Sequence, residues 1–123
     1  QKLVENRRGT NPYLFYMFIS IVETLMPEVT IVYWRDIPAQ VIVGKGRRGS
    51  KVQLHERFEQ AIDRAAMKCN LKGSDDYLAE WRKSEPYTVE GDPDTVARNE
   101  ARRIETEFNQ EILKTLIKNE GRK

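Results

Sequence analysis

Hydrophobic and polar residues alternate along two consecutive stretches that begin near Val29. Residues 29–35 place valine, isoleucine and tyrosine on one face and threonine, valine and tryptophan on the other. A period of two in β-branched and aromatic residues predicts a strand, and two partly apolar faces predict a central one. Asp36-Ile37-Pro38 turns the chain, because proline fixes φ and cannot donate to a ladder. Residues 39–43 return as a second strand, so we expect a hairpin.

The apolar spacing becomes helical after Ser50. Apolar residues recur on one helical face at Leu54, Phe58, Ala61, Ile62, Ala65 and Cys69. Ser50 and Gln53 match a capping box at the start, and Asn70 and Gly73 are suitable stop residues. This pattern predicts a helix over residues 50–69. Cys69 is expected to pack in the core rather than to act as a nucleophile.

The last third of the chain repeats both patterns. Residues 75–89 alternate and predict a third, half-buried strand that breaks at Glu85-Pro86. Asp92 and Pro93 fit the N-cap and first position of a helix. The following stripe predicts one helix over residues 93–119, about 27 residues and ~40 Å long. A compact domain of this size is only ~35 Å across, so its last turns should overhang.

The overhanging turns carry an apolar stripe that predicts a protein contact. The expected partner-binding residues are Ile112, Leu113, Leu116 and Ile117. Their partner would be another protein, a second copy of the chain or the N-terminal segment. The alternative is a bent or frayed helix end that packs on the chain's own core.

From Met26 onward the elements follow the order ββαβα. This order predicts an α+β fold, a small two-layer sandwich with a three-stranded sheet and two helices on one face. Residues 1–25 stand apart. Their apolar run over residues 13–22 is shorter than the ~20 residues that span a bilayer, and no signal cleavage pattern follows. We expect residues 1–25 to be an extension outside the native protein, which would open at Met26.

Composition narrows the class of protein. The chain has 123 residues, 33% charged and 39% hydrophobic, which is typical of one soluble globular domain. Its net charge of +2 and pI near 8.7 make it mildly basic, a weak pointer to a polyanionic partner. One cysteine and one histidine exclude a disulfide framework and a structural zinc site. We expect a cytoplasmic location, no membrane contact, no metal and no cofactor.

A basic glycine loop joins the second predicted strand to the first predicted helix. Gly44, Gly46 and Gly49 match G-x-G-x-x-G in the order strand, loop, helix, which is the context of a phosphate cradle. No acidic residue lies between Gly44 and Val52. The predicted anion-binding residues are Lys45, Gly46, Arg47, Arg48, Gly49, Ser50 and Lys51. The alternative is a solvated turn in which the glycines only permit the backbone path.

A dinucleotide site is disfavoured, because the chain is too short for the doubly wound sheet and no acid lies in a second-strand position about twenty residues later. The loop also lacks the Gly-Lys-Ser/Thr of a Walker motif. Arg35, Asp36 and His55 are the only polar group near the loop that could act in catalysis. No spacing supports a nucleophile–base pair, so a catalytic role is not expected.

Three segments carry a resemblance to a known family. The chain resembles the small bacterial "virulence factor" domain in MPEVTIVYWRDIPAQVIVGKGRR, RFEQAIDRAAM and YLAEWR. It is also similar to the terminal domain of conserved virulence factor C proteins. The resemblance covers residues 26–96 and leaves out residues 1–25. It implies a single domain of this type over residues 26–123 and supplies no catalytic residues. The family's occurrence beside folate and corrinoid one-carbon genes implies an accessory role.

Two functions from different classes follow. The first is a small, non-catalytic accessory protein that acts through protein–protein contacts, in line with the implied link to one-carbon metabolism. The second is a module that binds an anionic ligand, such as a nucleotide, a folate or nucleic acid, through residues 44–51. The aromatic residues Tyr33, Trp34 and Trp81 could stack on a base or pterin, or could simply fill the core.

Overall fold

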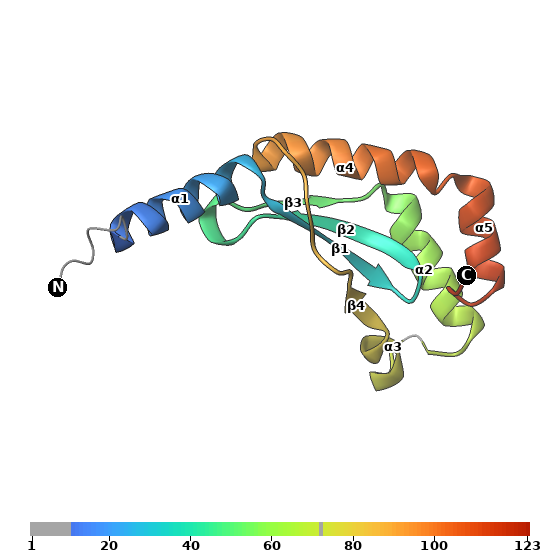
Figure 1. The fold of residues 1–123 in the computed structure, drawn as a ribbon. Helices are drawn as coiled ribbons and strands as arrows, with labels where there is room; N and C mark the ends of the chain where they lie inside the picture. Colours follow the sequence, from blue (N-terminus) through green and yellow to red (C-terminus); the bar gives the residue numbers. More distant parts are fainter. Residues whose placement is uncertain (1–10, 72) are drawn as a thin grey trace.

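The computed structural model describes residues 11–71 and 73–123 as an antiparallel sheet covered by helices (Figure 1). The strands are β1 (Glu28–Trp34), β2 (Ile37–Val43), β3 (Ser50–Gln53), β4 (Trp81–Lys83) and β5 (Tyr87–Thr88). The helices are α1 (Pro12–Leu25), α2 (Glu56–Lys68), α3 (Asp75–Ala79), α4 (Pro93–Glu107) and α5 (Gln110–Lys118), with a short 3₁₀ turn η2 (Gly46–Arg48). An open antiparallel sheet with several helices confirms the mixed helix-and-strand class. The predicted strand count is wrong, because the sheet has five strands.

The sheet is built on the β1–β2 hairpin that the alternation predicts. The strand order is β3-β2-β1-β4, and β5 pairs with the same edge of β1 as β4 does. The hairpin pairs Val29 with Val43 at one end and Trp34 with Ile37 at the other, with a bulge between Val32 and Tyr33. β1 is therefore central, as its two partly apolar faces predict.

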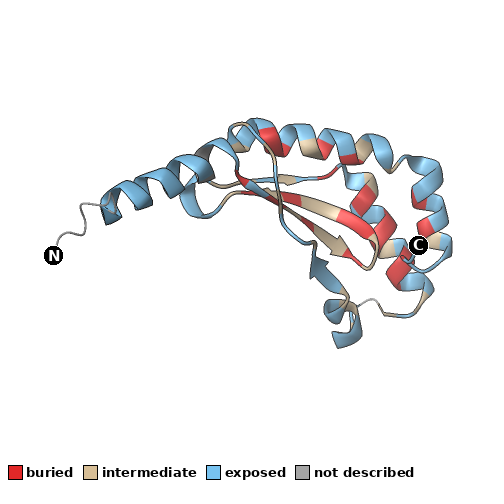
Figure 2. Cartoon of the chain, in the orientation of Figure 1, coloured by how far each residue is buried: buried red, intermediate tan, exposed pale blue. Residues whose placement is uncertain are grey.

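One face of this sheet packs against the helices and forms the core. Buried residues lie on β1, β2 and the facing sides of α2, α4 and α5 (Figure 2). Along β1, Val29 and Ile31 are buried, whereas Thr30 and Val32, which alternate with them, are only half-buried. This alternation shows that the helices cover one side, since successive side chains of a strand point to opposite faces.

Residues 50–53 form the strand β3, so the prediction that the first long helix starts at Ser50 is wrong. Ser50 and Val52 point inward and Lys51 and Gln53 outward, which is a strand's period of two. The capping box on Ser50 is accordingly wrong as well. α2 begins after His55, whose Nδ1 accepts a hydrogen bond from the backbone N–H of Arg57.

The segment predicted as a third strand, residues 75–89, contains a helix and two short strands. Ser74 caps α3, because its hydroxyl accepts a hydrogen bond from the N–H of Tyr77. The predicted break at Glu85-Pro86 is confirmed, since it separates β4 from β5. Local capping here prevails over a residue pattern that alternates for only a few positions.

The predicted single helix over residues 93–119 is two helices. Asp92 caps α4 as predicted, but α4 ends at Glu107, and Asn109 caps α5 by accepting from the N–H of Ile112. Figure 1 shows α5 turning away from the direction of α4. The predicted overhang is therefore wrong. Leu113 and Leu116 are buried in the chain's own core.

α1 extends away from the rest of the domain (Figure 1). Its large hydrophobic side chains are exposed from Tyr13 through Val22, by 38% to 76%. Residues 1–10 of the predicted extension lie outside the described residues. Among the helices described for residues 11–71 and 73–123, none combines the length and apolar composition needed to cross a membrane.

A side-chain network fixes β5 to α4. The hydroxyl of Tyr87 donates to Glu100, which also accepts from Arg103 at 3.0 Å. Burial and the hydrogen bond to Glu100 raise the pKa of Tyr87 to about 12. Burial alone would raise the pKa of Glu100, but the hydrogen bonds from Arg103 and Tyr87 leave it below its ordinary value. β5 is only two residues long, and this network adds side-chain contacts to its pairing with β1.

Candidate functional site

The basic glycine loop is the turn of the β2–β3 hairpin. Gly44 and Gly46 have φ of 74° and 60°, a conformation that glycine adopts without strain. Gly49 is held closely: a Cβ there would lie 3.2 Å from the carbonyl oxygens of Val43 and Gly46. The loop does not lead into a helix, so the strand–loop–helix context that makes G-x-G-x-x-G a phosphate motif is absent.

The predicted anion-binding residues divide into two groups. Lys45, Arg47 and Arg48 are exposed at the tip of the hairpin, which also includes Gly46 and the half-buried Gly49. Ser50 and Lys51 belong to β3, where Lys51 pairs with Ile42 across the sheet. The structure therefore brings three cations together at the tip and places the fourth along the strand.

The hairpin tip borders an open cleft of about 640 Å³. The loop contributes Gly44, Lys45, Arg47, Arg48 and Gly49 to its lining. The opposite walls are Val22 and Met26 at the end of α1, and Pro93 and Asp94 at the start of α4. The lining contains two carboxylates, Glu28 and Asp94, opposite the three cationic side chains of the loop. The cleft thus combines a cationic end with an apolar wall.

The side chains of Lys45 and Arg47 have no hydrogen-bond or ion-pair partner among residues 11–71 and 73–123. Their charges therefore face solvent or a ligand. Two like charges two residues apart repel each other, and a bound anion would relieve that repulsion. Arginine can also grip a phosphate or carboxylate with two parallel hydrogen bonds.

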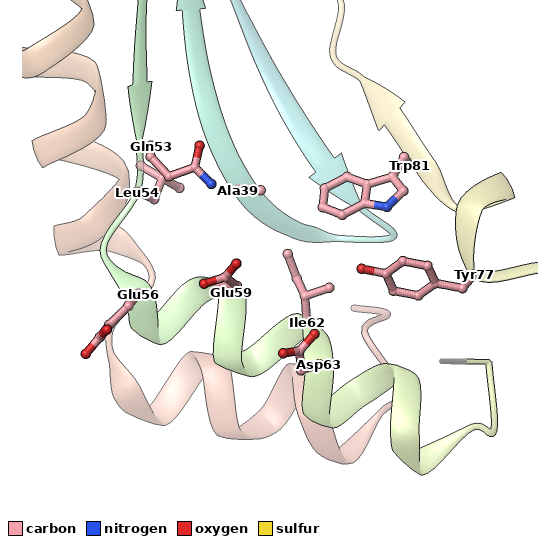
Figure 3. Close-up of a pocket in the computed structure, with 9 residues that line it drawn as sticks. All are labelled: Ala39, Gln53, Leu54, Glu56, Glu59, Ile62, Asp63, Tyr77 and Trp81. Atoms are coloured by element: carbon pink, nitrogen blue, oxygen red, sulfur yellow. The ribbon is translucent and has the colours of Figure 1, made fainter. Parts of the chain in front are cut away.

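A second, smaller hollow lies between α2 and the α3–β4 segment (Figure 3). Its volume is about 200 Å³. Its lining residues are Ala39, Gln53, Leu54, Glu56, Glu59, Ile62, Asp63, Tyr77 and Trp81. Sequence reasoning missed this hollow. The available signal was the spacing of the three acids, which places residues 56, 59 and 63 near one another on a helix.

The polar group considered for catalysis is not one site. Asp36 accepts hydrogen bonds from Arg82 at 3.0 Å and from the backbone N–H of Lys123 at 2.7 Å. Burial alone would raise the pKa of Asp36, but these two hydrogen bonds leave it below its ordinary value. The backbone N–H of His55 donates to Glu105 instead. Arg35 and Asp36 hold the C-terminal residues against the β1–β2 turn, and His55 caps α2.

The three aromatic residues considered for stacking have different surroundings. Trp34 is fully buried, and its Nε1 donates to the carbonyl oxygen of Tyr77 at 2.9 Å. Tyr33 is half-buried, and the Arg82 guanidinium lies over its ring, 4.5 Å from the ring centroid. Trp81 is 36% exposed and lines the smaller hollow. Only Trp81 combines exposure with a place in a hollow.

Comparison with known proteins places the domain in a family. A search of curated proteins and a search of solved structures returned no match. The model of the family described as "Virulence factor" matches residues 32–117, which run from the middle of β1 nearly to the end of α5. The match includes both the hairpin loop and the smaller hollow. Because it covers more than half of the chain, the chain belongs to the virulence factor family.

Proposed function

We propose that this protein is a non-catalytic binding module that holds an anionic group at the tip of the β2–β3 hairpin. The observation that supports it is the cleft of about 640 Å³ lined by Lys45, Arg47 and Arg48. A hairpin that served only as a turn would not require three cations beside a concave surface.

The shape of the cleft favours a small ligand with an apolar part. The cationic loop would hold a phosphate or carboxylate, and the exposed side chains of Val22 and Met26 would contact a ring or chain. Glu28 and Asp94 disfavour a second anionic group at the far wall, since like charges repel. A folate or a mononucleotide fits this distribution better than a polyanion. The implied one-carbon setting of the family would supply folates.

Replacing Lys45 and Arg47 with serine should remove most of the binding of inorganic phosphate and of a mononucleotide. Both side chains lack a described partner, so their loss should leave the melting temperature without ligand nearly unchanged. Isothermal titration of the parent and the variant measures the difference. We expect the Kd to rise at least tenfold, which corresponds to a loss of about 1.4 kcal/mol in the free energy of binding.

A matched control separates the site from net charge. Lys83 and Lys114 are exposed and lie on β4 and α5. Their change to serine also removes two positive charges, but away from the hairpin tip. This control should bind as the parent does. Equal weakening in both variants would mean that net charge alone attracts the ligand, and the hairpin would then be only a turn.

Self-association is the second candidate function, because α1 exposes hydrophobic residues on all sides. Leu14, Phe15 and Phe18 are 58%, 62% and 63% exposed. Exposed apolar area of this kind is typical of an interface, and two copies of one apolar helix are complementary in chemistry. The proposed occupant is a second copy of the chain.

The change of Leu14 and Phe18 to serine should abolish a concentration-dependent increase in mass. Sedimentation equilibrium of the parent and the variant measures it. Ile112, the most exposed of the four predicted partner-binding residues at 42%, gives a comparison through Ile112→Ser. A parent that stays monomeric up to millimolar concentration would eliminate this candidate.

A further inference from the structure

We propose that the hollow between α2 and the α3–β4 segment binds an organic cation, an alkylammonium group on an apolar stem. This inference is independent of the anion site, which lies at the opposite end of β2. The hollow is bordered by Ala39 near the start of that strand, whereas the loop follows its last residue, Val43. We call it the amine pocket.

The aromatic wall of the amine pocket consists of Tyr77 and Trp81. Their ring centroids are 6.2 Å apart and the rings meet edge to face at 88°. Tyr77 also packs on Trp34, with centroids 5.6 Å apart, and its carbonyl oxygen accepts from the Trp34 indole. Since Trp34 is fully buried, the wall is fixed to the core. A fixed aromatic face attracts a cation through the ring quadrupole.

The base of the pocket is apolar. Ala39, Leu54 and Ile62 line it, and Figure 3 shows Tyr77 pointing toward Ile62. A volume of about 200 Å³ equals the liquid volume of about six or seven water molecules. A linear alkylamine of five carbons has six heavy atoms and matches this space. The stem would displace water from apolar surface, which favours binding.

The acidic rim supplies the charge that an ammonium group requires. Glu59 and Asp63 rise from α2 on the side of the pocket (Figure 3), and Glu56 lies at its outer end. The carboxylates of Glu56 and Glu59 have no ion-pair or hydrogen-bond partner among the residues that the structure describes. Carboxylates at i and i+3 or i+4 on one helix repel each other. A cation between the rim and the aromatic wall would relieve that repulsion.

The geometry points to an organic cation rather than to a metal ion. Within residues 11–71 and 73–123, no group of three or more histidine, cysteine, aspartate or glutamate side chains is placed to hold a metal. The carboxylates therefore border the space without converging on one point. Apart from the amide of Gln53, the remaining wall is aromatic and aliphatic, which suits a charged group carried on a hydrocarbon chain.

The test is an NMR titration of the full chain with pentylamine at neutral pH, with 1-pentanol as the uncharged probe of equal length. We expect saturable shifts of the Trp81 indole and of the α2 amides with the amine, and at least threefold weaker binding of the alcohol. Equal binding of amine and alcohol, or no saturable shift with the amine, would overturn the proposal.

Variants connect the binding to the named residues. Glu59→Gln keeps the shape and removes one charge, and Trp81→Leu removes the outer aromatic face; each should weaken pentylamine binding at least threefold. Glu90→Gln, an exposed carboxylate in the loop before α4, is the matched control and should bind as the parent does. Equal weakening by Glu90→Gln would contradict the assignment. The Lys45→Ser, Arg47→Ser protein should retain amine binding, which separates this test from that of the anion site.

Two sources could supply the alkylammonium group, a free amine or the side chain of a lysine in a partner protein. A blocked tripeptide, acetyl-Ala-Lys-Ala-amide, is compared with pentylamine in the same titration. Tighter binding of the peptide would identify the pocket as a lysine receptor, and tighter binding of pentylamine would identify it as a site for a small amine.

Discussion

Replacing Trp34 with alanine is expected to lower the free energy of unfolding by about 3–5 kcal/mol. Trp34 is fully buried at the end of β1, and its indole donates to the carbonyl oxygen of Tyr77. The Arg35 guanidinium lies 5.1 Å from its ring centroid. A Cβ on Gly121 would lie 2.9 Å from the ring, so the C-terminal residues also pack on it. One side chain thus connects β1, α3 and the end of the chain.

Chemical denaturation of the Trp34→Ala and Trp81→Ala proteins measures this effect. Trp81 is the matched control because it is partly exposed and contributes to a pocket wall rather than to the core. Its replacement should cost less than about 1 kcal/mol. A domain of this size has about 5–15 kcal/mol of total stability, so the Trp34 variant should lose a large fraction of it. Equal losses in the two variants would contradict the central place given to Trp34.

Replacing Leu113 with alanine is expected to lower the free energy of unfolding by about 2–5 kcal/mol. Leu113 is 4% exposed, and α5 packs closely on α2. The neighbouring Ile112→Ala change should cost less than about 1 kcal/mol, because Ile112 is 42% exposed. Thermal unfolding of the two single variants gives the comparison. A larger loss for Ile112→Ala would mean that α5 presents its other side to the core.

This pair also decides what the apolar stripe at the end of the chain does. Leu113 and Leu116 are buried and Ile117 is half-buried, so the stripe largely stabilises the chain's own fold. Ile112 is the only fully exposed residue among the four predicted partner-binding residues. A partner contact there stays a prediction, and it would involve Ile112 with other exposed residues rather than the two leucines.

The sequence predicted the parts of the fold that depend on local patterns. The β1–β2 hairpin follows from clean alternation on both sides of a turn. The turn itself is Arg35-Asp36, so the prediction that it includes Ile37 and Pro38 is wrong, because both residues pair with β1 as part of β2. The cap at Asp92 follows from a side chain that accepts from the N–H of Thr95 at 3.0 Å. Asn70 follows the C-cap of α2 with a φ of 61°, the left-handed conformation of a helix stop. Each of these features is decided within a few residues.

The errors arose where tertiary contacts decide between local alternatives. Ser50 to Gln53 could begin a helix or continue a hairpin, and pairing with β2 makes them a strand. Asn109 lies within an apolar stripe of helical period, so the stripe alone does not reveal the bend. The Arg57 guanidinium, which donates to the carbonyl oxygens of Glu105 and Phe108, stabilises that bend from another helix. Such a contact between residues about fifty positions apart has no local signature.

In the candidate sites, too, the sequence predicts what local residues decide and misses what only the fold brings together. The basic character of residues 45–48 was readable, and the structure places those side chains at a cleft. The helix expected behind the loop was wrong, so its dipole cannot assist an anion there. The amine pocket could not be predicted, because Trp81 and Glu59 come from segments that only the fold brings together.

The most direct measurement is the titration of the full chain with inorganic phosphate, followed by the backbone amide signals of residues 44–49. We predict saturable shifts that are confined to the hairpin tip and the start of α4. These shifts should be absent in the Lys45→Ser, Arg47→Ser protein and retained in the Lys83→Ser, Lys114→Ser protein. Shifts spread over all basic surface residues, or of equal size in the two variants, would contradict an anion site at the β2–β3 hairpin.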